Sequence, residues 1–225
     1  MSSIKIVVII MLALLIPFIL ITGSITLISQ LPAFYAYEFE KLGVFEEIGL
    51  EASPEEVSKM MVDYIKGKTD EFQMTAKVKG VSRNIFNEKE QLHMVDVRNL
   101  ISLGNMVCWI GSLLIVLLYI MLIKLKQKTA LRKAYKLSAL VYILILVGMV
   151  IMSISDFNKG FNLFHEVLFT NDLWILNPNK DILLMMMPLN FFMDAFKIAL
   201  FLSTTVMIML GVMTWKITQK RNMFS

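Results

Sequence analysis

Four long runs of residues without a charged side chain determine what this chain can fold into. The runs cover residues 6–30, 99–123, 137–155 and 198–215. A helix crosses the hydrocarbon core of a bilayer with about 20 predominantly apolar residues, and each run reaches or approaches that length. The chain is 57% hydrophobic and 18% charged, whereas soluble domains are roughly 45–50% apolar and 25% charged. The sequence therefore excludes an ordinary soluble domain and predicts a mainly α-helical integral membrane protein with four transmembrane helices.

The positions of the charged residues predict how these helices are oriented. The stretches 31–98 and 156–194 carry all 18 acidic residues and 11 basic ones. Cytoplasmic loops carry an excess of Lys and Arg, so we expect both termini in the cytoplasm and the two larger connections outside. The net charge of +4 then reflects topology, and we expect no nucleic-acid partner. The expected cytoplasmic side contains no acidic residue and ten basic ones, namely Lys5, Lys124, Lys126, Lys128, Arg132, Lys133, Lys136, Lys216, Lys220 and Arg221.

Runs and charges together give an expected layout of the chain. The first run is too long for the apolar region of a signal peptide, which has about 7–15 residues, and we expect it to be retained. The layout is transmembrane helix 1 at 1–30, an extracytoplasmic cap at 31–98, transmembrane helix 2 at 99–123, a basic cytoplasmic loop at 124–136, transmembrane helix 3 at 137–155, an extracytoplasmic interfacial or re-entrant segment at 156–189, transmembrane helix 4 at 190–215 and a cytoplasmic tail at 216–225.

Two helix starts are well signalled within the expected cap. Ser53 and Glu56 form an S-x-x-E capping box ahead of an apolar stripe at helical spacing, and Gly67 is a stop signal. Asn87 and Glu90 form a second plausible capping box. We expect the helix that begins there to continue without interruption into the second apolar run.

The chain has only two histidines, His93 and His165, and both fall on the acid-rich side. His93 shares a helix face with Asp96 and lies roughly 10 Å outside the first fully apolar turn, at headgroup depth. His165 lies in the aromatic segment 160–174, which is too polar to span and suits the membrane–water interface. Histidine titrates near physiological pH, so both are candidates for proton transfer, although a hydrogen-bonding role would also account for each of them.

Common cofactor and metal motifs are missing from the sequence. There is no H-E-x-x-H spacing, no G-x-S-x-G elbow, no P-loop and no dinucleotide fingerprint. The single cysteine, Cys108, lies within the second apolar run, so we expect no internal disulfide. The sequence therefore predicts neither a metal nor a cofactor.

Two segments resemble the signatures of a known family. Residues 88–100 contain the pattern H-M-x-D-V, and residues 164–174 contain F-H-x-x-x-F-x-N-D-x-W, with Asn177-Pro178 and Pro188 following. Both resemble the signature segments of the lipoprotein intramolecular transacylase (Lit) family, and the four-span layout with a large first outer loop is similar too.

The resemblance implies a reaction in the cytoplasmic membrane of a Gram-positive bacterium. Enzymes of this family move the sn-2 acyl chain of a diacylglyceryl-modified cysteine to its free α-amino group, which gives a lyso-form lipoprotein. The implied partners are such lipoproteins and membrane lipids, and the implied catalytic residues are His93 and His165 at the extracytoplasmic face. Transfer from an ester to an amide is downhill, so no cofactor is required.

Five further residues are candidates for supporting roles. Asp96 is expected to fix the tautomer of His93, and Arg98 to supply positive charge at the headgroup layer. Asn171, Asp172 and Trp174 are expected to shape the site around His165. Two alternatives stay open, namely a metal-dependent membrane lipid hydrolase and a non-catalytic membrane sensor or transport accessory protein.

Overall fold

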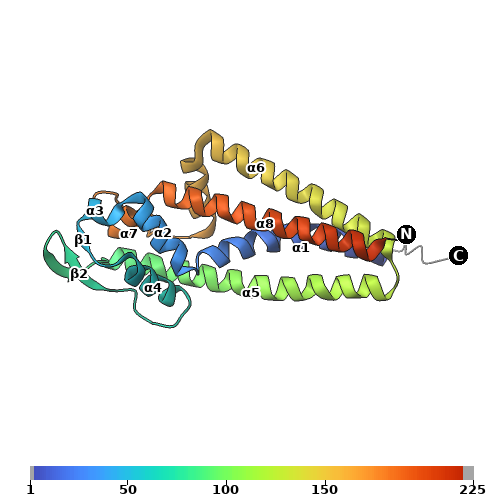
Figure 1. The fold of residues 1–225 in the computed structure, drawn as a ribbon, viewed down its shortest axis with the longest axis horizontal. Coiled ribbons are helices and arrows are strands. Elements are labelled where there is room, and N and C mark those ends of the chain that lie inside the picture. The colour runs from blue at the N-terminus through green and yellow to red at the C-terminus, as the bar shows by residue number, and fades with distance from the viewer. Residues whose placement is uncertain (1–2, 220–225) are drawn as a thin grey trace. The chain divides into compact units, whose positions relative to one another are not determined.

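The computed structural model describes residues 3–219, so Lys220 and Arg221 lie outside the described residues. Four long helices dominate it (Figure 1). All are long and apolar enough to cross a membrane, which confirms the predicted mainly helical membrane protein. The helices are α1 (Ser3–Ile28), α5 (Glu88–Lys124), α6 (Lys128–Leu168) and α8 (Leu189–Thr218).

The chain divides into two compact units, and each long helix contributes to both. Unit 1 comprises residues 1–24, 105–154 and 199–225, and unit 2 comprises 25–104 and 155–198. The core of unit 1 is mostly aliphatic and includes Leu12, Ile16 and Leu122. Its outer surface exposes many large apolar side chains, as a surface in contact with lipid requires.

The basic connection between the second and third spans is shorter than predicted. Helix α5 runs to Lys124 and α6 begins at Lys128, so most of the expected 124–136 loop is helical. Lys and Arg are good helix formers. The charges that end an apolar run therefore do not end the helix.

Helix α6 also continues beyond the predicted end of its span at residue 155. Its backbone leaves the helical region at Asp156, with φ −166° and ψ 91°, and a second helical stretch then runs to Leu168. Oδ1 of Asp156 accepts a hydrogen bond from the backbone N–H of Lys159 at 3.0 Å. Asp156 is therefore the N-cap of that stretch. The expected interfacial segment 156–189 thus begins as a capped helix that includes His165.

Unit 2 contains the short elements of the chain. These are α2 (Pro32–Leu42), α3 (Val44–Ile48), β1 (Leu50–Glu51), α4 (Pro54–Ile65), β2 (Thr75–Val78), β3 (Val81–Asn84) and α7 (Ile182–Met186). The three strands form an antiparallel sheet in the order β1-β2-β3, and the turn between the last two has positive φ at Lys79 and Gly80. Helix α2 packs against α4.

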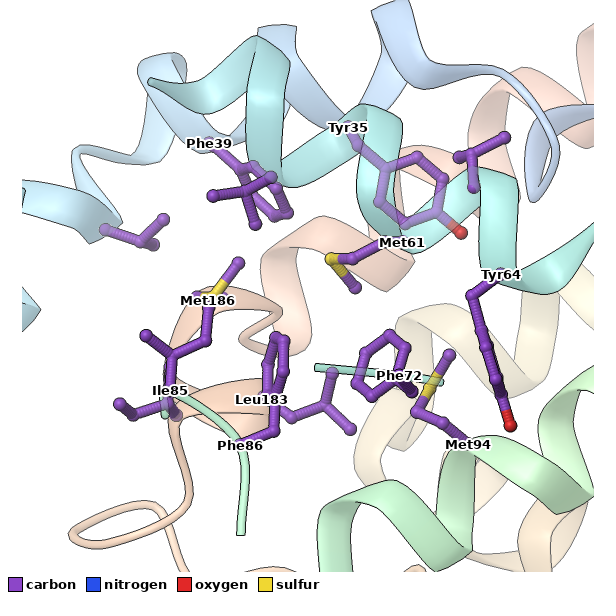
Figure 2. Packing of buried hydrophobic residues seen from close by; sticks show 14 of the residues in the cluster. Tyr35, Phe39, Met61, Tyr64, Phe72, Ile85, Phe86, Met94, Leu183 and Met186 are labelled. Carbon is purple, nitrogen blue, oxygen red and sulfur yellow. The ribbon is translucent and has the colours of Figure 1, made fainter. Parts of the chain in front are cut away.

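The core of unit 2 combines aromatic and methionine side chains with aliphatic ones (Figure 2). Phe72 and Phe86 have ring centroids 4.4 Å apart, and Met61 and Met186 are fully buried among such residues. Burying a side chain of this size stabilises a fold by about 1.5–3 kcal/mol relative to leaving it exposed. This core holds the short helices and the sheet together as one body.

The predicted capping box of Asn87 and Glu90 forms in full, whereas that of Ser53 and Glu56 forms only in part. Oγ of Ser53 accepts a hydrogen bond from the N–H of Glu56 at 3.2 Å, but within residues 3–219 the Glu56 carboxylate makes no return bond to the N–H of Ser53. Asn87 and Glu90 cap each other: Oδ1 of Asn87 accepts from the N–H of Glu90 at 3.0 Å, and Oε2 of Glu90 accepts from the N–H of Asn87 at 2.6 Å. Helix α5 starts there and continues for 37 residues, as predicted. The cap thereby fixes the position of His93, one turn further along α5.

Candidate active site

The two histidines lie next to each other in unit 2. Their ring centroids are 6.2 Å apart and the rings are tilted by 36°. His93 comes from the first turns of α5, and His165 from the capped stretch at the end of α6. Both are buried, with 7% and 8% of their surface exposed. Two segments far apart in the sequence thus bring the only imidazoles of the chain into one cluster.

The protonation pattern of His165 is fixed by a backbone group. Its Nδ1 lies 2.8 Å from the carbonyl oxygen of Phe161, one helical turn earlier. A carbonyl oxygen can only accept a hydrogen bond, so Nδ1 carries the hydrogen. In the neutral ring, Nε2 is then an unprotonated acceptor. Burial lowers the pKa of His165, and the hydrogen bond to Phe161 opposes this shift.

Aromatic side chains surround the His165 imidazole. The rings of Phe161 and Trp174 lie 4.3 and 5.0 Å from it, and Phe169 lies 5.4 Å away. Phe164 contacts it edge-on at 5.3 Å. Trp174, which is expected to shape the site around His165, stacks on its ring. For the phenylalanines the sequence predicts only a place at the membrane boundary, although Phe161, His165 and Phe169 recur at the i, i+4 spacing of a helix face.

His93 is the more strongly perturbed of the two. It lies before the charge-free run that begins at Asn99, and burial lowers its pKa to about 4, with His165 acting in the same direction. Its Nδ1 is buried and has no hydrogen-bond partner among residues 3–219. At neutral pH both imidazoles are therefore uncharged, and each can accept one hydrogen bond and donate another.

Asp96 is not the group that orients His93. Its Oδ2 accepts a hydrogen bond from Nδ2 of Asn171 at 2.9 Å, while Nδ1 of His93 is left without a partner. The expectation that Asp96 fixes the tautomer of His93 is therefore wrong. A spacing of three residues places two side chains on one helix face, but the short aspartate bonds across to the loop instead. Oδ1 of Asn171 in turn accepts from the N–H of Leu173 at 3.0 Å.

A pocket of about 260 Å³ lies beside the histidines. Neither histidine lines it, but Phe169 does, and this ring also contacts both imidazoles. One wall is a face of α5 and the other is the end of α6 with the residues that follow. The lining residues are Asp96, Asn99, Leu100, Leu103, Leu168, Phe169, Thr170 and Asn171.

Arg98 and Asp172 are not brought to the histidines. Arg98 donates to the carbonyl oxygen of Thr69 at 3.1 Å and lies over the ring of Tyr64, with 5.1 Å between guanidinium carbon and ring centroid. Asp172 is exposed, and its carboxylate makes no hydrogen bond or ion pair within residues 3–219. His93 and Arg98 both belong to α5, but their side chains leave the helix in different directions.

The described part of the chain contains no group of three or more His, Cys, Asp or Glu side chains arranged to hold a metal ion. The chemistry visible in the site is that of two neutral imidazoles in an aromatic surround, with a carboxylate and two amides in the pocket beside them. Such a set can accept a proton, donate a hydrogen bond to a developing negative charge and bind a polar group.

The family model described as "Lipoprotein intramolecular transacylase Lit" matches residues 10–192. Among solved structures, the membrane integral lipoprotein intramolecular transacylase Lit from Bacillus cereus is similar to the whole chain, with a TM-score of 0.78, 19% identity and 100% of each chain covered. A structure of that protein with one histidine replaced by arginine gives a TM-score of 0.74 at 19% identity, covering 97% of this chain and 93% of that one. Its counterpart with alanine at the same histidine gives a TM-score of 0.74 at 20% identity, covering 98% of this chain and 96% of that one. No curated protein sequence matches the chain.

Proposed function

Because the chain belongs to the lipoprotein intramolecular transacylase (Lit) family, we propose that His93 and His165 catalyse its acyl transfer. As a member of this family it is an acyltransferase of a bacterial membrane that acts on lipoproteins. The substrate we propose is a lipoprotein whose N-terminal cysteine carries a diacylglyceryl group and a free α-amine. The sn-2 acyl chain moves from the glycerol oxygen to that amine.

One observation carries the assignment of the catalytic residues, namely the 6.2 Å separation of the two imidazole rings. A group that hydrogen-bonds to a ring nitrogen lies about 4 Å from the ring centroid. Spheres of that radius around two centroids this far apart overlap, so one substrate group can contact both rings. The amine and the ester belong to one molecule, and holding them in this space recovers part of the roughly 7–11 kcal/mol available from proximity.

His165 is the general base in this proposal. The hydrogen bond from Nδ1 to the Phe161 carbonyl supports this role because it leaves the lone pair of Nε2 free. The amine nitrogen attacks the ester carbonyl carbon, and Nε2 of His165 takes a proton from the amine as it does so. The same proton then passes to the glycerol oxygen as the C–O bond breaks, so the C–N bond forms without net gain or loss of protons. General-base assistance of this kind contributes about 10²–10⁴-fold to a rate.

His93 is the electrophilic partner. Because burial lowers the pKa of His93 to about 4, its ring is neutral at working pH and is a poor source of a full proton. A neutral imidazole N–H can still donate a hydrogen bond to the oxyanion of the tetrahedral intermediate. The two histidines then have different tasks, one accepting a proton and the other stabilising negative charge.

Trp174 and the pair of Asp96 and Asn171 support the site indirectly. Trp174 stacks on His165 and limits the orientations of its ring. The hydrogen bond from Asn171 to Asp96 ties the segment that carries Phe169 to α5. Arg98 and Asp172 have no contact that supports such a role, and the mechanism does not use them.

The site faces the outside of the cell in this proposal. The basic residues at both termini and in the stretch 124–136 favour a cytoplasmic position for those parts, which puts the acid-rich stretches outside. His93 and His165 both belong to these stretches. Lipoproteins of the proposed kind would then meet the site within the outer leaflet of the membrane.

Lipopeptide analysis tests the proposed function directly. The chain is produced with a reporter lipoprotein in a host without this activity, and the N-terminal lipopeptide is sequenced by mass spectrometry. We expect an N-acylated cysteine with one acyl chain left on the glycerol. His93→Gln and His165→Gln should each lower the yield by at least about 100-fold, whereas Glu46→Gln, at an exposed position of α3, should not.

Other products would contradict the proposal. Release of free fatty acid without N-acylation would indicate a membrane lipid hydrolase, and sensitivity of that release to chelators would indicate a metal-dependent one. An unmodified lipopeptide would indicate a sensor or an accessory protein. Full transfer by the double variant of His93 and His165 would contradict the assigned catalytic residues even if the reaction itself is observed.

A further inference from the structure

The pocket beside the histidines is polar at one end and apolar at the other. Asp96, Asn99, Leu100 and Leu103 follow one another at positions i, i+3, i+4 and i+7 along one face of α5. At a rise of 1.5 Å per residue this face is about 10 Å long. It begins with a carboxylate before the charge-free run of residues 99–123 and ends among leucines within that run. Leu168 completes the apolar end.

The carboxylate at the polar end has no cationic partner. Asp96 is half-buried, and its one hydrogen bond comes from the neutral amide of Asn171. No Lys or Arg within residues 3–219 forms an ion pair with it, although Lys side chains of unit 2 neutralise Asp63 and Asp194. A partly buried carboxylate without a counter-charge is complementary to a cation on a ligand.

We propose that this pocket binds the free α-ammonium group of the lipoprotein's N-terminal cysteine at Asp96, with one acyl chain of the same diacylglyceryl group along Leu100, Leu103 and Leu168. This inference rests on the proposed function and names how that site selects its substrate. The ligand it requires has a cationic head joined to an aliphatic chain through a short thioether and glyceryl linker. An N-acylated cysteine lacks the cation, so the pocket distinguishes substrate from product and from lipoproteins that are already triacylated.

Phe169 connects this binding step to the chemistry. Its ring lines the pocket and contacts both His93 and His165, so a cysteine bound at Asp96 lies beside the imidazoles. An α-amine has a pKa of about 7.7–8.0 and is mostly protonated at neutral pH. Asp96 recognises this charged form. The ammonium then releases one proton to water, and the neutral amine attacks while Nε2 of His165 takes the second proton and passes it to the glycerol oxygen. Asp96 is thus a recognition residue and not a base.

A binding experiment with unreactive ligands tests the inference apart from catalysis. The ligands are a dialkylglyceryl-cysteine lipopeptide with ether linkages, which has no acyl group to transfer, and its N-acetyl derivative. At pH 6.5 we expect the detergent-solubilised full chain to bind the free amine about ten-fold more tightly, as for a charge-assisted hydrogen bond. Asp96→Asn, which can still accept from Asn171, should abolish this preference, and Asp96→Glu should restore part of it. Glu166→Gln, which removes an exposed carboxylate next to His165, should keep it.

The apolar end has an independent test. Leu103→Trp fills the pocket and should weaken the binding of both long-chain ligands at least about ten-fold, while ligands with short alkyl chains bind as before. Equal binding of amine and N-acetyl ligands by the wild type, or an unchanged preference in Asp96→Asn, overturns the inference. If the preference depends on Asp96 but the ester lipopeptide is not converted, the pocket assignment stands and the proposed function fails. If the ester lipopeptide is converted but the wild type shows no preference for the free amine, the proposed function stands and the pocket assignment fails.

Discussion

Unit 1 and unit 2 bury different kinds of polar side chain. Among residues 3–219, the buried polar side chains of unit 1, tyrosines aside, are those of serine and threonine. They are Ser24, Ser138, Ser203, Thr214 and Thr218. Every buried carboxyl or imidazole belongs to unit 2, and these are Glu38, Glu90, His93, His165 and Asp181. The groups that can titrate are therefore concentrated in the unit that contains the candidate site.

The hydrogen bonds of these groups differ in kind. In unit 1 every one of these hydroxyls donates to a carbonyl oxygen one turn earlier in its own helix, as Ser203 does at 2.8 Å. Links from these hydroxyls to other helices, such as that from Ser138 to the carbonyl oxygen of Leu12 at 3.0 Å, are additional to that bond. In unit 2, Oε1 of Glu90 accepts from the N–H of Leu183 at 2.6 Å, and Asp181 accepts from Asn87 at 2.8 Å. Long helices satisfy their own backbone, whereas short elements need polar links between distant segments. We infer that unit 2 depends on individual polar residues far more than unit 1 does.

Replacement of Glu90 should show the largest effect of this dependence. Glu90→Ala leaves the buried N–H of Leu183 without an acceptor, which costs about 1–3 kcal/mol. It also removes the capping bond to the N–H of Asn87, which contributes about 1 kcal/mol. We expect a loss of about 3 kcal/mol in the free energy of unfolding. Trp174 is the only tryptophan of unit 2, so fluorescence of a variant that keeps only Trp174 follows this unit in detergent.

The matched control for this substitution is Glu88→Ala. Glu88 belongs to the same turn of α5 but is exposed, so its removal should cost at most about 0.5 kcal/mol. Glu90→Gln keeps one acceptor oxygen and should fall between the two. Equal effects at positions 88 and 90 would break the comparison, because the buried links would then carry no special weight.

The pH dependence of unit 2 should come next in size. The pKa of His93 is lowered to about 4 in the folded protein from an ordinary value near 6.5, so the folded state binds this proton less readily than the unfolded state. The stabilisation is present above pH 6.5 and is lost as the pH falls from 6.5 through 4. Between pH 7 and pH 5 we expect unit 2 to lose on the order of 1–2 kcal/mol.

The variant His93→Gln isolates this contribution. The free energy of unfolding of this variant should fall less between pH 7 and pH 5 than that of the wild type. The decrease that remains should include a contribution from His165, whose pKa is also lowered by burial. Parallel stability profiles for wild type and variant would show that His93 titrates normally. The thermal midpoint of the Trp174 signal at several pH values provides the measurement.

Local signals in the sequence predicted the start of the helix that carries His93. Asn87 and Glu90 are three residues apart, and the reciprocal bonds of a capping box follow from that spacing alone. The four charge-free runs likewise predicted the long helices. The second bond of Glu90, to Leu183, could not be predicted, because it joins segments whose relative position depends on the whole core of unit 2.

The arrangement around His165 was only partly predictable. The resemblance to a family linked His93 with His165, whereas no spacing rule brings two distant segments together. The helix beyond residue 155 was missed because its start lies inside α6, although Asp156 is a typical N-cap residue. Without that helix, the i, i+4 spacing of Phe161, His165 and Phe169 could not be interpreted as a face.

Removal of the Asp156 cap should have a moderate effect. Asp156→Ala takes away the acceptor of the Lys159 N–H, and loss of an N-cap costs about 1 kcal/mol. Asp156→Asn retains a capping oxygen and should stay close to the wild type. The cap begins the stretch that carries His165, so the Trp174 signal is again the measurement. A larger loss for asparagine than for alanine would contradict the capping role.

The smallest effect should come from a buried polar group of unit 1. Ser203→Ala removes the 2.9 Å contact between its hydroxyl and that of Tyr142, but Tyr142 keeps Thr204 at 2.8 Å as a second partner. Hydrogen bonds between membrane helices contribute about 0.6 kcal/mol on average, so we expect the free energy of unfolding to fall by that amount or less. The fluorescence of a variant in which Trp109 and Trp215 are the only tryptophans measures this loss. A double-mutant cycle with Tyr142→Phe measures the interaction energy of the pair itself.

A loss of 2 kcal/mol or more in Ser203→Ala would remove the difference between this variant and Glu90→Ala, because unit 1 would then depend on single polar links as strongly as unit 2. A loss near zero would sharpen it, since the hydroxyls of unit 1 would serve their own helices rather than the packing between them.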